Sequence, residues 1–195
     1  MTQILCKSNG LLMAGVLMAG ALASCSSDNE GDIVSTSGCG RLSVQIGAEA
    51  EFATRALDES NWKSAANYTV EIYKGNNRVA AYAPGNLPSG TIDLPFGTYE
   101  VKAWYGTQSN ASRNDFRSEG SSTVSLQSGE TKAVTLTCAP TCGKAKVQFS
   151  TEMATYFTDY YVTFSTPKLT SSDNVVWSKT DTAPWYLLVD KAGST

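Results

Sequence analysis

The 195-residue sequence contains no histidine, and only 17% of its residues are charged. Without histidine the chain cannot form a Ser-His-Asp triad, a histidine general base or a histidine-ligated metal site. Its 15 Lys and Arg residues stand against 18 Asp and Glu residues, which gives a formal net charge of −3. This weakly acidic balance argues against a nucleic-acid partner, because phosphate binding requires a concentrated basic surface.

The sequence also lacks a hydrophobic run long enough for a transmembrane helix. The uncharged stretch from Leu11 to Leu22 has about 12 residues, whereas a membrane-spanning helix needs about 20. With Lys7 before it, this stretch fits the core of a signal peptide.

Small residues follow this core and end in Leu22-Ala23-Ser24-Cys25. The segment resembles the lipobox of bacterial lipoproteins, in which a peptidase cuts before the cysteine and the new N-terminal cysteine is acylated. We therefore predict a lipoprotein signal peptide over residues 1–24 and lipidation at Cys25. An ordinary secretory signal is the alternative.

Residues 25–39 are predicted to form a flexible tether, because residues 26–32 are polar, acidic and rich in Gly and Ser. This early acidic cluster is similar to the surface-export signals of Bacteroidota-type lipoproteins, and a plain solvated linker is the alternative. We expect a protein that is lipid-anchored in the outer membrane through Cys25 and exposed on the cell surface.

Of the five cysteines, Cys6 would leave with the signal peptide and Cys25 would carry the lipid, so Cys39, Cys138 and Cys142 remain. They allow one disulfide, and their spacing does not choose among the three pairings. Because Cys39 precedes the first predicted strand and Cys138 ends a late strand, a disulfide from Cys39 to either Cys138 or Cys142 is plausible. Three reduced thiols are the alternative. Cys138 and Cys142 could supply only two ligands, and the sequence shows no second ligand pair to complete a metal site. We therefore predict no metal and no cofactor.

Alternation of apolar and polar residues with a period of two dominates the chain after the tether. Such half-buried strands, rich in β-branched and aromatic residues, predict sheets packed face to face. Turn signals fit this pattern, because Gly75-Asn76-Asn77 and Ser128-Gly129-Glu130 each separate two strands. The alternating segments are residues 42–46, 68–72, 99–105, 134–138 and 145–149.

The segment from Leu94 to Tyr99, Leu-Pro-Phe-Gly-Thr-Tyr, is the most specific structural signal. Pro95 ends a strand because it cannot donate to a ladder, and Gly97 supplies the backbone freedom for a corner. Tyr99 then enters the next strand with its ring inward and its hydroxyl able to bond backbone across the corner. This arrangement resembles the tyrosine corner of immunoglobulin-like and fibronectin-type sandwiches.

We therefore predict an all-β fold. An immunoglobulin-like (fibronectin/transthyretin-like) β-sandwich is expected over residues 40–138, and a second, smaller β unit over residues 139–195. This second unit is small for an independent core. We expect it to be truncated, completed by docking on the first domain, or completed by another chain.

Several short segments combine with the lipobox and the acidic tether, among them residues 40–44, 94–99 and 134–149. Together they resemble a family of Bacteroidota-type surface lipoproteins with domains of unknown function, similar in layout to fimbrillin-like proteins. In fimbrillins an arginine-specific protease cuts within the first domain, and removal of the first strand opens a groove that a neighbouring subunit's strand fills. The resemblance implies a processing site at Arg55-Ala56, and a surface arginine in an exposed loop is the alternative. No clear donor strand follows Val189, which departs from the pilin pattern.

The sequence offers little for catalysis, since it has neither a nucleotide-binding glycine loop nor a Gly-x-Ser-x-Gly elbow. Its tryptophans are the better binding signal, and alternation places Trp104 on the polar face of its strand. We name Trp104 and Trp62 as candidate glycan contacts, because exposed aromatic rings stack on sugars; core packing is the structural alternative.

We therefore predict a non-enzymatic, lipid-anchored cell-surface protein that acts in adhesion or as a fimbria-like structural component. A glycan-binding accessory lipoprotein for polysaccharide uptake is the alternative, and a hydrolase ranks far below both. The predicted partners are the membrane, other surface proteins and glycans, and not nucleic acid.

Overall fold

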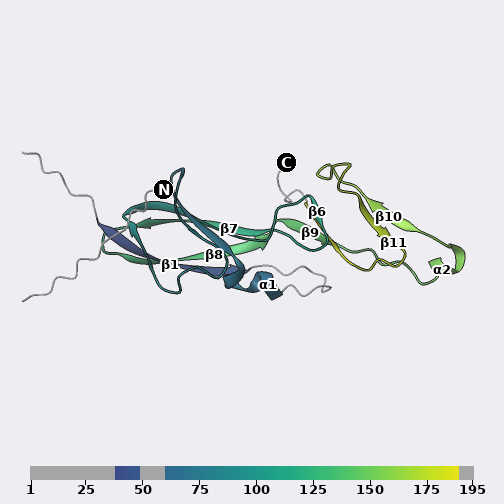
Figure 1. Cartoon of the computed structure of the whole chain (residues 1–195), viewed down its shortest axis with the longest axis horizontal. Helices are drawn as coiled ribbons and strands as arrows, with labels where there is room; N and C mark the ends of the chain where they lie inside the picture. The colour runs from purple at the N-terminus through teal and green to yellow at the C-terminus, as the bar shows by residue number, and fades with distance from the viewer. Residues whose placement is uncertain (1–37, 49–59, 189–195) are drawn as a thin grey trace, which may run out of the picture.

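The computed structural model of the protein describes residues 38–48 and 60–188. Cys25, Arg55 and Ala56 lie outside these residues. Within them the chain is mostly β-strand, as the sequence predicts. Figure 1 shows an elongated molecule with a sandwich at one end, a small sheet in the middle and a two-stranded hairpin at the other end.

The sandwich is formed by a seven-stranded sheet in the order β3-β2-β5-β7-β8-β1-β4. β7 and β8 pair near one end of both strands, at Ser118 with Pro140 and at Glu119 with Ala139, whereas the earlier part of β8 pairs with β1. The sheet therefore curls into two layers, β3-β2-β5-β7 and β8-β1-β4. The strands are β1 (Cys39–Ala48), β2 (Thr69–Lys74), β3 (Asn77–Tyr82), β4 (Ile92–Pro95), β5 (Gly97–Tyr105), β7 (Ser118–Leu126) and β8 (Thr131–Pro140).

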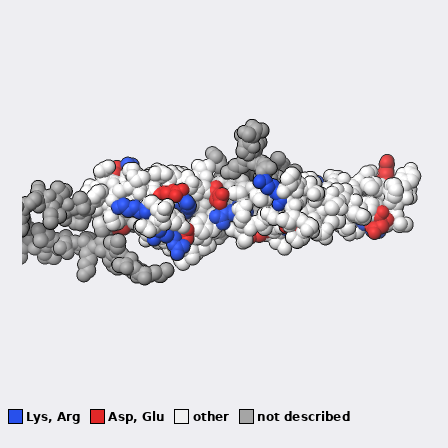
Figure 2. All heavy atoms as spheres, turned by 90° about the horizontal axis from the view of Figure 1, so that it is seen from above, with Lys and Arg blue, Asp and Glu red and all other residues white. Residues whose placement is uncertain are grey.

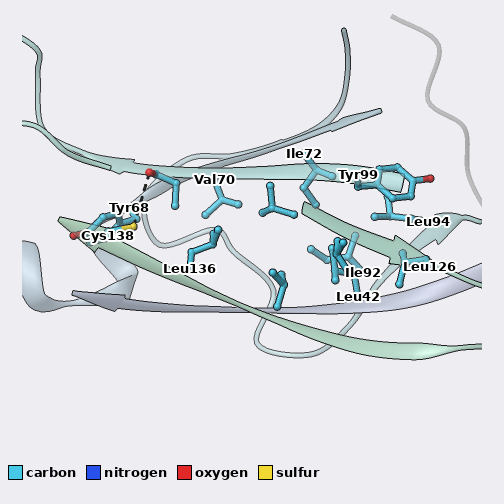
Figure 3. Close-up of a cluster of buried hydrophobic side chains, with 14 residues drawn as sticks. Leu42, Tyr68, Val70, Ile72, Ile92, Leu94, Tyr99, Leu126, Leu136 and Cys138 are labelled. Carbon is cyan, nitrogen blue, oxygen red and sulfur yellow. Dashed lines mark hydrogen bonds between the residues drawn. The ribbon is translucent and has the colours of Figure 1, made fainter. Parts of the chain in front are cut away.

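The hydrophobic core lies between these two layers (Figure 3). It is built from the alternate apolar residues of the strands, which confirms the period of two that the sequence shows. Side chains from both layers meet there and exclude water, which is the main favourable term in the folding of the sandwich. The completely buried members are Leu42, Val70, Ile72, Val101, Leu136 and Cys138.

Two pairings define the strand order within this sandwich. β1 and β8 are parallel over eight residue pairs, from Arg41 with Thr131 to Ala48 with Cys138. β5 and β7 are antiparallel neighbours in one layer, paired over nine residues from Gly97 with Leu126 to Tyr105 with Ser118. The first and last strands of the sandwich therefore lie side by side and run in the same direction.

The tyrosine corner predicted from the sequence is confirmed at the link between β4 and β5. Tyr99 is buried, and its hydroxyl donates a hydrogen bond to the carbonyl oxygen of Pro95. Gly97 has a φ of +144°, a conformation that residues with a side chain rarely adopt. The proline, the glycine and the tyrosine each have the role that their chemistry predicts.

The other described strands form a three-stranded sheet in the order β6-β12-β9 and a hairpin of β10 and β11. β6 comes from the segment between β5 and β7, so the predicted first unit supplies one strand to the three-stranded sheet. The elements are β6 (Ala111–Ser112), β9 (Cys142–Ala145), α2 (Met153–Tyr156), β10 (Tyr161–Phe164), β11 (Val175–Ser178) and β12 (Trp185–Leu188). Before β2 lie the short helix α1 (Ser60–Lys63) and the 3-10 helix η1 (Ala65–Asn67).

An aromatic junction of Trp62, Phe116 and Tyr186 connects the sandwich to the three-stranded sheet. The rings of Phe116 and Tyr186 stack with centroids 4.9 Å apart, and Trp62 meets Phe116 edge-on at 6.0 Å. Ala48 at the end of β1 and Cys142 at the start of β9 pack against the same cluster. The two parts of the molecule therefore share buried surface at this junction.

The disulfide considered from the sequence is not formed, because Cys138 and Cys142 are both reduced. The parallel pairing of β1 and β8 gives the reason. It places Cys138 opposite Ala48, whereas Cys39 begins β1 and lies opposite Pro95. The strand from Cys39 to Ala48 is about 30 Å long, and a disulfide needs Cα atoms within about 7 Å.

Candidate functional site

Five exposed hydrophobic side chains belong to α2, the residue after it and β10, at one end of the molecule. Only one other large hydrophobic side chain among the described residues, Val79, is comparably exposed. Figure 2 shows that, on the face seen there, Lys and Arg side chains lie mainly over the sandwich and the middle of the molecule, while the far end carries a few acidic groups among uncharged side chains. We call the following five residues the distal tip: Tyr156 (78% exposed), Phe157 (56%), Tyr161 (70%), Val162 (37%) and Phe164 (39%).

The distal tip is held in place by β11, which pairs with β10 in antiparallel register. Val175 and Trp177 of β11 are buried beside Leu187 of β12, and the indole nitrogen of Trp177 donates to the carbonyl oxygen of Ala183 at 3.0 Å. β10 lies outside this core, and all four of its residues are exposed. Within the described part of the chain its outer edge pairs with no strand. Folded proteins usually cover or charge such an edge.

Arg113 fixes the base of this hairpin against the segment that contains β6. Its guanidinium forms a bidentate pair with Asp181, donates to the carbonyl oxygen of Val176 at 2.7 Å and lies 4.4 Å from the ring centre of Trp185. The hydrogen bonds from Arg113 hold the pKa of Asp181 below its ordinary value. This network sets the direction in which the distal tip points.

A second surface feature, which we call the outer groove, lies on the solvent face of β2, β5 and β7. Its volume is about 640 Å³. Because residues alternate between the two faces of a strand, the outward residues of these three strands meet there. The side chains that line it are Glu71, Tyr73, Glu100, Lys102, Trp104, Arg117, Glu119 and Ser121.

Each carboxylate of the outer groove is paired with a cation. Arg78 contacts Glu71 at 2.5 Å, Lys102 contacts Glu100 at 3.2 Å, and Arg117 contacts Glu119 at 2.7 Å. Burial raises the pKa of Glu71, but hydrogen bonds from Tyr73 and Arg78 outweigh that effect and lower this pKa overall. The groove is therefore densely charged but close to neutral as a whole.

Two aromatic rings lie along the outer groove, and each has a cation above it. Arg117 lies 5.1 Å from the ring centre of Trp104, and Lys102 lies 5.1 Å from that of Tyr73. Trp104 is opposite Thr69, and Tyr73 lies four residues after Thr69 on β2, so the backbone positions of the two aromatic residues are about 13 Å apart along the sheet.

The structure separates the two tryptophans that the sequence grouped as candidate glycan contacts. Trp104 lines the outer groove, on the face that alternation predicts. Trp62 is only 1% exposed and belongs to the aromatic junction, so it cannot contact a glycan and this prediction is wrong. The reason is that α1, a helix of one turn, turns Trp62 toward Phe116 and Tyr186, which come from distant parts of the chain.

The distal tip is not among the sites that the sequence patterns predict. A signal is present in the sequence, because Tyr156, Phe157 and Tyr161 lie within one short segment of the chain.

In residues 38–48 and 60–188, no three His, Cys, Asp or Glu side chains are grouped to hold a metal ion. The helices of these same residues include none that is long and apolar enough to span a membrane.

Comparisons with known proteins give a family and a low-identity similarity to solved structures. The model of a family described as a domain of unknown function (DUF4493) matches residues 38–195. No curated protein matches the sequence.

Two solved structures are similar at low identity. A DUF3823 family protein from Parabacteroides merdae is 14% identical, with a TM-score of 0.29 over 77% of this chain and 79% of that one. A "putative adhesin" from Bacteroides ovatus is 11% identical, with a TM-score of 0.28 over 65% of this chain and 52% of that one. The chain thus spans about half the length of the second structure.

Proposed function

The chain belongs to the DUF4493 family, and we propose that it is a non-enzymatic adhesion protein of the cell surface, held at the outer membrane by a lipid on Cys25. The lipobox-like segment before Cys25 supports the anchor. The acidic segment after it supports display outside the cell.

The observation that carries the proposal is the position of the distal tip. It lies at the opposite end of the molecule from the start of β1, where the tether from Cys25 would join the sandwich (Figure 1). A lipid at Cys25 would therefore attach at the end of the molecule opposite Tyr156, Phe157 and Tyr161, which leaves these side chains free to reach another surface. Exposed apolar patches cost solvation free energy, and in soluble domains they mark contact surfaces.

The outer groove supports a non-enzymatic role. Its three carboxylates are each engaged by a cation, and the lowered pKa of Glu71 keeps that group ionised at neutral pH. A general acid or base works best with a pKa near the operating pH. Such groups are suited to binding by hydrogen bonds rather than to proton transfer.

The open edge of β10 favours a second form of the proposal, in which the protein is a fimbria-like structural component. An exposed strand edge can accept a strand from another chain, because its backbone N–H and C=O groups supply the ladder. In that case a neighbouring surface protein would cover the distal tip.

The anchor is tested by labelling cells of the native host with an alkyne fatty acid. We expect the wild-type protein to be labelled and to sediment with outer membranes, and the C25A variant to be unlabelled and released. Unlabelled wild-type protein that still begins at Met1 would overturn the anchor.

The adhesive role is tested by comparing the adherence of cells that display the wild type with that of cells that display a Phe157→Ser, Tyr161→Ser double variant. Both replaced side chains are exposed, so the fold should survive. We expect the double variant to lose most of the adherence to sister cells or to epithelial cells at equal surface abundance, and W104A to retain it. Full adherence by the double variant would contradict the proposal.

A further inference from the structure

We propose that the outer groove is a binding site for an uncharged oligosaccharide. The groove lies on the sandwich and shares no residue with the distal tip, so this proposal does not depend on the adhesive role of that tip. Four features of the groove argue for this ligand class.

The first feature is size and position. A volume of about 640 Å³ is in the range of sites for ligands of several rings. The groove is open along the flat outer face of three hydrogen-bonded strands, so its floor is rigid. An extended ligand can enter from the side without any movement of the backbone.

The second feature is the charge balance. Glu71, Glu100 and Glu119 are matched by Arg78, Lys102 and Arg117 within 3.2 Å. The lining holds three carboxylates and two cations, and Arg78, outside the lining, pairs with the third carboxylate, so an anionic or cationic ligand would have to break existing pairs. An uncharged ligand avoids this cost.

The third feature is the supply of hydrogen-bonding groups beyond those used in the pairs. Arg117 donates to Glu119 through Nε, and among the described residues no side chain accepts from its Nη groups. Ser121 is the next outward-facing residue of β7 after Glu119, and its exposed side chain adds a hydroxyl. Sugar hydroxyls both donate and accept, so they can use guanidinium N–H groups and carboxylate oxygens at once.

The fourth feature is the pair of rings, whose positions are fixed before any ligand binds. Arg117 is held by Glu119 and lies over Trp104, while the Tyr73 hydroxyl donates to Glu71 at 2.5 Å. A ring that is already ordered loses little entropy when a pyranose packs its C–H groups beside it, next to the cation that lies over the ring. The separation of about 13 Å along the sheet calls for an oligosaccharide rather than a single sugar.

The test uses the full chain and an array of uncharged plant, fungal and host oligosaccharides, followed by calorimetric titration with uncharged hexasaccharides and with charged oligogalacturonate. We expect at least one uncharged oligosaccharide to bind, and Trp104→Ala to weaken it at least tenfold. Tyr161→Ala, which removes an exposed ring from the distal tip, is the matched control and should bind as the wild type does.

A second variant tests the groove independently in case Trp104→Ala misfolds. Ser121→Arg places a long side chain into the groove from an exposed position, so the fold should persist while binding falls at least tenfold. The proposal is overturned if no uncharged oligosaccharide on the array binds, if oligogalacturonate binds more tightly, or if both groove variants bind as well as the wild type. None of these results bears on adherence through the distal tip, which the Phe157 and Tyr161 variants test separately.

Discussion

Tyr99 shows how much of the sandwich depends on the chemistry of single residues. Its hydroxyl satisfies the carbonyl of Pro95, and its ring fills the core beside Leu94 and Leu126 (Figure 3). We expect Tyr99→Phe to lower the free energy of unfolding by about 1 kcal/mol, because one hydrogen bond is lost while the ring stays. Urea denaturation measures this change, and Tyr161→Phe, at an exposed ring, should leave the midpoint unchanged. An unaltered midpoint for Tyr99→Phe would show that the hydroxyl does not stabilise the corner.

Asp181 makes the stability of the hairpin base depend on pH. Its pKa is lowered from the ordinary 3.8 by the bonds from Arg113, so its contribution is complete above that value and is lost as the pH falls through the lower folded-state pKa. We expect wild-type protein to melt at a higher temperature than Asp181→Asn at pH 7. The gap should shrink below about pH 4. Thermal unfolding at both pH values measures it, and a gap that stays constant with pH would contradict this account.

Residues whose role is local could be predicted from the sequence, and residues whose role is distant could not. Gly97 and Tyr99 act on neighbours in the chain, and the face of Trp104 follows from alternation within one strand. Trp62 is different, because its burial depends on Phe116 and Tyr186, which no local pattern connects to it. The same holds for Arg113, whose partners Val176 and Asp181 come from the far end of the sequence.

At the level of elements, the sequence predicts which residues form strands better than it predicts which strands pair with each other. Alternation shows which residues of β1 and β8 face the core, but it carries no information on whether the two strands run parallel. A disulfide from Cys39 to Cys138 is compatible with the alternation alone, and the parallel register rules it out. Strand length is decided by partners too: β9 ends at Ala145, where β12 begins, although apolar alternation continues to Phe149.

The position of Cys138 inside the sandwich leads to a prediction about its reactivity. Its thiol faces the carbonyl oxygen of Ala103, and burial together with the charge of Glu119 raises its pKa to about 11. Only thiolates react readily with iodoacetamide, so we expect Cys138 in the folded protein to be alkylated far more slowly than in urea. Mass spectrometry of the peptides measures both rates. Equal rates, or a peptide pair that links Cys39 to Cys138, would contradict the structure.

For the molecule as a whole, the aromatic junction decides whether the sandwich and the three-stranded sheet unfold together. Trp62, Phe116 and Tyr186 come from both parts, so we expect the wild type to show a single calorimetric transition. Trp62→Ala should cost about 3–5 kcal/mol and split the transition in two, because it opens a cavity between the parts.

Trp62→Phe is the control for this experiment. It keeps most of the ring volume and removes an indole N–H that has no partner in the described part of the chain. We expect it to retain a single transition at a smaller cost in stability. A single transition in Trp62→Ala would mean that other contacts connect the two parts.

The parallel register of β1 and β8 has a mechanical consequence for a protein pulled between a membrane and a captured surface. Tension would enter at the start of β1 and leave at the end of β8, on the side where β9 follows. The hydrogen bonds between the two strands would then be sheared together rather than opened one after another, so rupture needs the whole ladder to fail at once. A domain joined in this way should resist being torn apart by flow far better than its equilibrium stability alone suggests.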